Sequence, residues 1–119
     1  HRDSRDRRGI DVALIYRQSV FSPVSESWKT PEYEGQKMDT RDILHACLRD
    51  TAGKDMHFIV NHHPSKYGGS KASEDRRMAA MTALADIVSL VKRIRSLEIV
   101  ISSGVIPPSH SYFSSSFKP

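Results

Sequence analysis

The feature that most constrains the fold of this chain is one long segment with helical periodicity. From Ser73 to about Arg95, apolar residues recur at every third or fourth position, which predicts a single helix with one apolar stripe. Ser73 is a good N-cap, and acidic residues in the first turn and basic residues in the last turn match the helix dipole. The stripe consists of Met78, Met81, Leu84, Ala85, Val88, Val91 and Ile94. We therefore expect the helix methionines to lie in the core.

Short apolar runs on both sides of this segment predict a sheet. Met56–Asn61 comes before the helix and Leu97–Ile101 comes after it. Arg41–Arg49 is also strand-like, and the turn at Ala52–Asp55 should join it to Met56–Asn61 as an antiparallel hairpin. A helix between strands predicts an α/β fold in which the helix packs on the sheet.

The first 40 residues are expected to contribute less regular structure. Ile10–Arg17 is a short β-rich run that we interpret as a strand buried on much of both faces. Val20–Val24 is interpreted as a second short strand, interrupted by a proline. Ser25–Thr40 is polar and contains proline and glycine, so it is interpreted as a loop or weak excursion with Trp28 and Tyr33 as anchors.

Composition limits the classes of function without choosing one. The formal charge of +4 and the pI of about 9.4 favour anionic partners, but do not separate nucleic acid, lipid headgroups and small phosphates. The single cysteine, Cys47, excludes a disulfide framework and is expected to be a buried, inert thiol. No apolar run reaches the roughly 18 residues that a membrane span requires. No obligate protein partner is evident.

A polar cluster follows the strand predicted at Met56–Asn61. It combines the amide of Asn61, the imidazoles of His62 and His63, and the cation of Lys66 in a flexible loop. This set suits an anionic oxygen such as that of a phosphate, and it contains no nucleophile. Because side chains alternate along a strand, only one of the two histidines can point into a site without a bulge.

Other candidate residues have a purely structural interpretation as well as a functional one. Arg8 precedes a predicted strand, where it can flank a phosphate-binding cleft or be solvated. Arg77 lies at the helix start and can reach substrate, a loop carbonyl or a carboxylate. Asp11 is expected to pair with an arginine, with metal binding as the alternative. His45 and His57 lie on neighbouring strands, where cross-strand packing is preferred over a zinc site.

Four blocks of the chain carry a family resemblance. They are Asp6–Arg17, Thr40–His45, Phe58–Ser65, and Gly68-Gly69 with Ser73–Ala80. In this order they resemble the endonuclease/exonuclease/phosphatase superfamily, most closely its bacterial branch. The resemblance covers residues 1 to 102, and His63 stands where that branch usually has tryptophan.

The resemblance implies a four-layer α/β sandwich, of which this chain is a fragment made of an antiparallel sheet and a packed helix. It also implies hydrolysis of phosphate esters with Mg²⁺ or Mn²⁺, in which the cation neutralises charge on the phosphoryl oxygens. On this resemblance His62 matches the phosphate-contacting position, and Asn61 beside it is a catalytic candidate that orients this neighbour or, alternatively, caps the loop. Lys66, Arg8 and Arg77 are the candidates for substrate binding.

Other family motifs have no counterpart in this sequence. The early Asn and Glu that hold the metal would lie before His1, and the expected Gly-Asp-x-Asn is replaced by Ser103-Gly104-Val105-Ile106. We expect a partial domain over residues 1–102, inactive alone and without a metal site of its own. The serine- and proline-rich tail, 103–119, is expected to be unstructured, and one hypothesis is that it is read out of frame.

Two further expectations stay open at this point. The alternative function is a non-catalytic basic module that binds nucleic acid or phospholipid and needs no divalent ion. Localisation is undetermined, although bacterial proteins of this branch are often exported.

Overall fold

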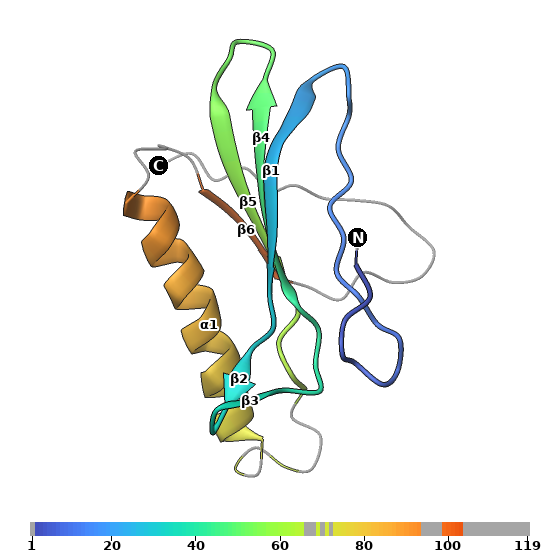
Figure 1. Ribbon diagram of the computed structural model, residues 1–119, viewed down its shortest axis with the longest axis vertical. Helices are drawn as coiled ribbons and strands as arrows, with labels where there is room; N and C mark the ends of the chain where they lie inside the picture. The colour runs from blue at the N-terminus through green and yellow to red at the C-terminus, as the bar shows by residue number, and fades with distance from the viewer. Residues whose placement is uncertain (1, 66–68, 70, 72, 94–98, 104–119) are drawn as a thin grey trace.

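A computed structural model of the 119-residue chain describes residues 2–65, 69, 71, 73–93 and 99–103. Figure 1 shows one helix beside a twisted sheet. No helix among the described residues is both long enough and apolar enough to span a membrane. The elements are β1 Phe21–Lys29, β2 Glu32–Tyr33, β3 Gln36–Lys37, β4 Ile43–Asp50, β5 Asp55–Asn61, α1 Glu74–Arg93 and β6 Ile99–Ser103.

The main sheet has the strand order β1-β4-β5-β6. β1, β4 and β5 are antiparallel, whereas β6 runs parallel to β5 and is connected to it through α1. The predicted hairpin of β4 and β5 is confirmed, and its turn is closed by a hydrogen bond from the Asp50 amide to the Lys54 carbonyl. The fold is therefore the expected α/β unit of a largely antiparallel sheet and a packed helix.

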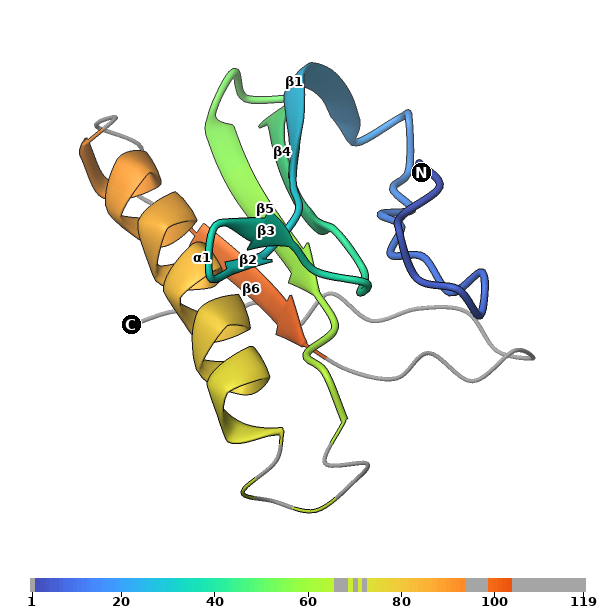
Figure 2. The same ribbon diagram turned by 60° about the horizontal axis from the view of Figure 1, so that its bottom comes forward.

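A second hairpin, β2–β3, lies beside the first turns of α1 (Figure 2). Its two turn residues, Glu34 and Gly35, both have positive φ, which is the backbone of a type I′ turn. This hairpin leads the chain from the end of β1 back to the start of β4.

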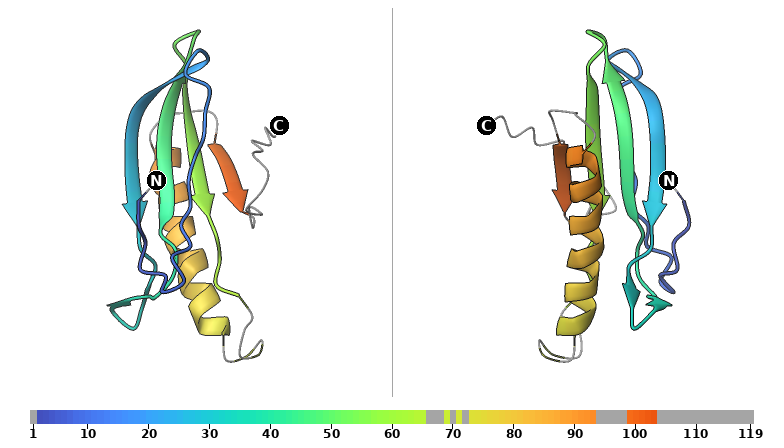
Figure 3. Two further views of the ribbon diagram at one scale, coloured as in Figure 1. Left: turned by 90° about the vertical axis from the view of Figure 1, so that its right-hand side faces the viewer. Right: turned by 60° about the vertical axis from the view of Figure 1, so that its left-hand side comes forward.

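The two faces of the sheet bury different segments. On one face Ile43 and Ile59 pack against the buried side of α1. On the other face Leu44 and Val60 pack against Val12 of the N-terminal segment. Figure 3 shows the helix and the N-terminal segment on opposite sides of the sheet. The sheet is thus the middle layer, and its alternating side chains supply both cores.

The prediction of a strand at Ile10–Arg17 is wrong. No residue of this segment pairs with a strand within the described part of the chain. Val12 is buried against the sheet, but Ile15 is 75% exposed. The apolar pattern reflects burial of alternate side chains on the sheet face, which does not require a hydrogen-bonded neighbour.

The extent of β1 corrects two further expectations. The strand begins at Phe21 and continues to Lys29, so residues 25–29 belong to β1 and not to the predicted loop. Its proline is tolerated because β1 is at the sheet edge and has a register shift between Pro23 and Ser25. Trp28 packs on the core as expected, whereas Tyr33 is exposed and donates to Asp75 over 3.3 Å.

The expectation that the helix methionines are core residues is also wrong. Met78 is 59% exposed and Met81 is 47% exposed. Leu84 and Val91 of the predicted stripe are buried, but the buried face is rotated so that Ala80, Ala83 and Ile87 take the place expected for the methionines. The buried residues of α1 are Ala80, Ala83, Leu84, Ile87 and Val91.

We expect Met78→Gln to change the free energy of unfolding by no more than about 0.5 kcal/mol, because the side chain is mostly in water. Met38→Gln is the matched control, since Met38 is buried and an amide placed there would lose hydrogen bonds to water, at a cost of at least about 1 kcal/mol. Urea denaturation measures both. Equal costs for the two variants would contradict the exposed position of Met78.

The remaining sequence expectations fall at the ends of elements. α1 begins directly after Ser73, as expected for an N-cap, and its described part ends at Arg93. Ser103 still belongs to β6. Residues 104–119, which include most of the tail expected to be unstructured, lie outside the described residues, so the proposed boundary stays a prediction.

Candidate functional site

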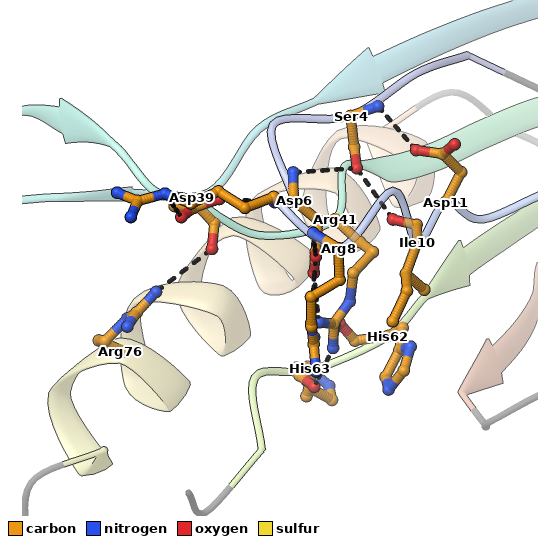
Figure 4. Close-up of polar contacts among 11 residues, drawn as sticks. Ser4, Asp6, Arg8, Ile10, Asp11, Asp39, Arg41, His62, His63 and Arg76 are labelled. Atoms are coloured by element: carbon orange, nitrogen blue, oxygen red, sulfur yellow. Dashed lines mark hydrogen bonds and ion pairs between the residues drawn. The ribbon is translucent and has the colours of Figure 1, made fainter. Parts of the chain in front are cut away.

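Four segments that are distant in sequence meet where β5 ends. They are the N-terminal loop with Asp6 and Arg8, the connection before β4 with Arg41, the residues after Asn61, and the first turn of α1 (Figure 4). The hairpin β4–β5 fixes two of these segments, because the start of β4 lies beside the end of β5. The polar cluster predicted after β5 therefore lies at the junction of the fold's connections.

Arg41 joins three of the segments. Its Nη1 donates to Oδ2 of Asp6 over 2.7 Å, and its Nη2 donates to the carbonyls of His62 and His63 over 3.3 and 2.9 Å. The side chains of Arg41 and Asp6 are only 3% and 4% exposed. A buried arginine needs this many partners, because an unpaired buried charge is strongly unfavourable. The position of both histidines thus depends on Arg41.

Arg8 lies over the same carboxylate from the solvent side. Its Nη2 and Nε donate to the two oxygens of Asp6 over 3.0 and 3.2 Å, and its backbone amide donates over 2.9 Å. The hydrogen bond from Arg8, supported by that from Arg41, holds the pKa of Asp6 well below its usual range although burial opposes this. Asp6 is therefore ionised at neutral pH, and the two guanidinium groups keep a fixed geometry around it.

A pocket of about 530 Å³ opens beside this cluster. Four arginines and two aspartates are among its lining residues, and the second aspartate, Asp39, is held by Arg7 over 2.6 Å. Both carboxylates are thus paired, and positive charge is in excess. The lining residues are Asp6, Arg7, Arg8, Asp39, Thr40, Arg41, Pro64, Ser65, Ser73 and Arg76.

His62 and His63 lie next to Arg8 and Arg41 at the end of β5, and both are half-buried (Figure 4). Burial lowers the pKa of His62, and the charges of Arg41 and Arg8 lower it further. Burial also lowers the pKa of His63. Both imidazoles are therefore neutral at pH 7, and a neutral imidazole can donate one hydrogen bond and accept another.

The structure brings some of the predicted site residues together and separates others. The charge of Arg8 acts on His62, and Asn61 is buried in the last position of β5. Lys66 lies outside the described residues. Arg77 does not line the pocket; its guanidinium donates to Oγ of Ser73, the N-cap residue.

Sequence reasoning missed three residues of this cluster: Asp6, Arg41 and Arg76. The first two belong to the blocks that carry the family resemblance, so that resemblance was the available signal. Arg76 lines the pocket and donates to the backbone carbonyl of Asp39 over 3.3 Å. Nothing in the sequence distinguishes it from its neighbour Arg77.

A divalent cation does not fit the described part of the site. Within residues 2–65, 69, 71, 73–93 and 99–103, no three His, Cys, Asp or Glu side chains group in a way that could hold a metal ion. Asp6 and Asp39 are both engaged by arginines. Asp11, the other acidic candidate, accepts from the Ser4 amide over 2.7 Å. The pocket is suited instead to an anion.

Fold and site together define an α/β unit with a cationic pocket at the end of a central strand. Residues 1–107 match the profile of the Endonuclease/Exonuclease/phosphatase family. Because this match covers most of the chain, the protein belongs to the Endonuclease/Exonuclease/phosphatase family.

A solved structure with a similar fold is the human Nocturnin catalytic domain with bound sulfate anion. It aligns with a TM-score of 0.61 and 15% sequence identity, over 72% of this chain and 30% of the Nocturnin chain. This chain thus spans less than a third of that catalytic domain, and the likeness concerns the fold. A search of curated proteins gave no match.

Proposed function

We propose that this chain provides the phosphate-binding part of a phosphoester hydrolase, in which His62 contacts the phosphate. The observation that carries the proposal is the position of a neutral imidazole beside Arg8 and Arg41 in a chain of this family. Phosphate esters are anionic, so a site for them needs fixed positive charge together with hydrogen-bond donors. The sulfate bound to the human Nocturnin catalytic domain is in keeping with an oxyanion site on this fold.

Each candidate has a distinct role in this proposal. His62 donates a hydrogen bond to a phosphate oxygen, and Asn61 supports the backbone that carries it. Arg8 is mostly exposed and attracts the anion, and Lys66 is proposed to do the same. A contact of Arg77 with substrate is also proposed, and it would require the side chain to leave Ser73.

The use of Mg²⁺ or Mn²⁺ in this family requires carboxylate ligands, and the described pocket does not offer free ones. Its own carboxylates are neutralised by arginines that also position the loops. We therefore propose that the 119-residue chain by itself binds phosphate esters and does not turn them over. The family match does not favour the alternative of a non-catalytic basic module.

Substitution His62→Gln should weaken binding of the dinucleotide dTpdT, which has one internal phosphodiester, by about 10- to 100-fold, because the flexible glutamine amide does not reproduce the position of the imidazole donor and a hydrogen bond to a charged group is lost. Isothermal titration calorimetry with the full chain measures the Kd, with and without Mg²⁺. His45→Gln is the matched control, because His45 lies in β4 and its imidazole contacts His57, away from the proposed phosphate site.

Two results would contradict the proposal. One is equal affinity of the wild-type and His62→Gln chains for dTpdT. The other is release of nitrophenol from bis(p-nitrophenyl) phosphate by the wild-type chain with Mg²⁺ at a rate that His62→Gln abolishes, because this would show that the chain is active alone.

A further inference from the structure

The pocket of about 530 Å³ with four arginines in its lining, here called the arginine pocket, shares two arginines with the surroundings of His62. His62 is not among the residues that line it, whereas Arg8 and Arg41 line the pocket and also act on His62. Arg41 binds the His62 carbonyl, and the charge of Arg8 lowers the pKa of the His62 imidazole. An anion at His62 and a second anion in the pocket would therefore both lie near Arg8 and Arg41.

Arg76 gives this pocket a positive charge that no described carboxylate offsets. Within the described residues, the one polar contact of its side chain is with the backbone carbonyl of Asp39, over 3.3 Å. The carboxylate of Asp39 is already bound by Arg7, through the Nε atom at 2.6 Å and the backbone amide at 3.1 Å. A guanidinium at a pocket wall with only one long hydrogen bond retains donors for a ligand.

Two buried polar atoms at the pocket also lack a partner within the described part of the chain. They are Oγ1 of Thr40 and Nε of Arg41, whose residues are 2% and 4% exposed. Buried polar groups are nearly always hydrogen-bonded, so such atoms in a pocket wall call for an explanation. Both atoms are closed to solvent in this conformation, so the donors within direct reach of a ligand are those of the exposed Arg76 and Arg8. The start of α1, where Ser73 and Arg76 line the pocket, adds the positive end of the helix dipole.

We propose that the arginine pocket binds a second phosphate group of the substrate, next to the phosphate at His62. This inference rests on the proposed function of His62, and it narrows the substrate to molecules with two neighbouring phosphates. The four arginines of the pocket exceed its two paired aspartates by two positive charges, one more than a phosphodiester monoanion needs, whereas a terminal phosphate carries up to two charges and three acceptor oxygens.

The test compares dTpdT with its 5′-phosphorylated form pdTpdT, using calorimetry on the full chain. The second phosphate should tighten binding about 10-fold. Arg76→Gln should remove most of this gain, because it deletes one charge-assisted contact, while leaving the affinity for dTpdT unchanged. Arg93→Gln is the matched control, since Arg93 is exposed at the opposite end of the same helix.

Inorganic pyrophosphate is the second probe, because it has two phosphates without a nucleoside. Binding of pyrophosphate that Arg76→Gln weakens, with no gain for pdTpdT, would support two joined phosphates as the recognised group. Equal affinity for dTpdT and pdTpdT, together with pyrophosphate binding that is insensitive to Arg76→Gln, would overturn the inference. In that case the proposed function would still stand if His62→Gln weakens the binding of dTpdT. If Arg76→Gln has the expected effects but His62→Gln does not weaken the binding of dTpdT, the proposed function of His62 would fail.

Discussion

Replacing Arg41 with methionine should lower the free energy of unfolding by about 3–5 kcal/mol, the usual cost of breaking a buried ion pair. Methionine matches much of the volume of the arginine stem but leaves Asp6 buried with Arg8 alone. It also removes the donors to the carbonyls of His62 and His63. The loss is large because both partners of the Arg41–Asp6 pair are almost fully removed from water.

Urea denaturation at pH 7.5 measures this loss, and Arg49→Met is its matched control. Arg49 also forms an ion pair, with Asp55 at 2.6 Å, but its side chain is 49% exposed. Exposed pairs contribute little, so this control should cost no more than about 1 kcal/mol. A similar cost for the two variants would contradict the role assigned to Arg41.

A double-mutant cycle separates the ion pair from the other contacts of Arg41. Asp6→Asn removes the carboxylate charge, and the cost of Arg41→Met should be smaller in that background. The part that persists belongs to the two carbonyl contacts of Arg41. Because these contacts position His62, we also expect weaker dTpdT binding by any Arg41→Met chain that remains folded.

The elements that sequence reasoning found correctly are those whose signal is local. β4, β5 and α1 each combine an apolar run with turn or cap residues inside a few positions of the chain. β1 was only partly found because it is an edge strand with mostly exposed, polar side chains. Ile10–Arg17 was misread because an apolar pattern indicates which side chains are buried, and does not indicate which backbone groups are paired.

The same distinction applies to the candidate site. His62 was found because it directly follows a buried strand. The Asp6–Arg41 pair joins residues 35 positions apart, and no periodicity links them. Arg76 and Arg77 are adjacent, but about 100° of helical rotation separates them, so that Arg76 lines the pocket while Arg77 contacts Ser73. Only tertiary structure distinguishes two such arginines.

Lowering the pH should destabilise the chain at pH values well above those at which carboxylates titrate, because the described histidines are held neutral in the fold. His45 and His57 are stacked with ring centroids 5.1 Å apart, and Nε2 of His45 lies 2.9 Å from Nδ1 of His57. Burial lowers the pKa of both, and the nearby His57 also lowers that of His45. Burial similarly lowers the pKa of His62 and of His63. The negative charge of Asp55 acts in the opposite direction on the pKa of His57, and that of Asp6 does so on the pKa of His62.

The sign follows from proton uptake. Below the ordinary histidine pKa of about 6.5, the unfolded chain binds protons that the folded chain does not, so folding loses stability as the pH falls. The contribution of these histidines to the free energy of unfolding is fully present above this pH. It declines as the pH falls toward the lowered pKa values of the folded chain. Each such histidine contributes up to about 1.4 kcal/mol per pH unit in that window.

For this reason we expect the free energy of unfolding to fall by about 2–3 kcal/mol between pH 7.5 and pH 5.5. Urea denaturation at pH 7.5, 6.5 and 5.5 measures the decline. Asp6 does not interfere, because its pKa is held far below this window and its contribution is lost only in stronger acid. His57→Gln removes one member of the stacked pair, so its profile should be shallower than that of the wild-type chain. A wild-type profile that is flat from pH 7.5 to pH 5.5 would show that these imidazoles titrate as they do in the unfolded chain.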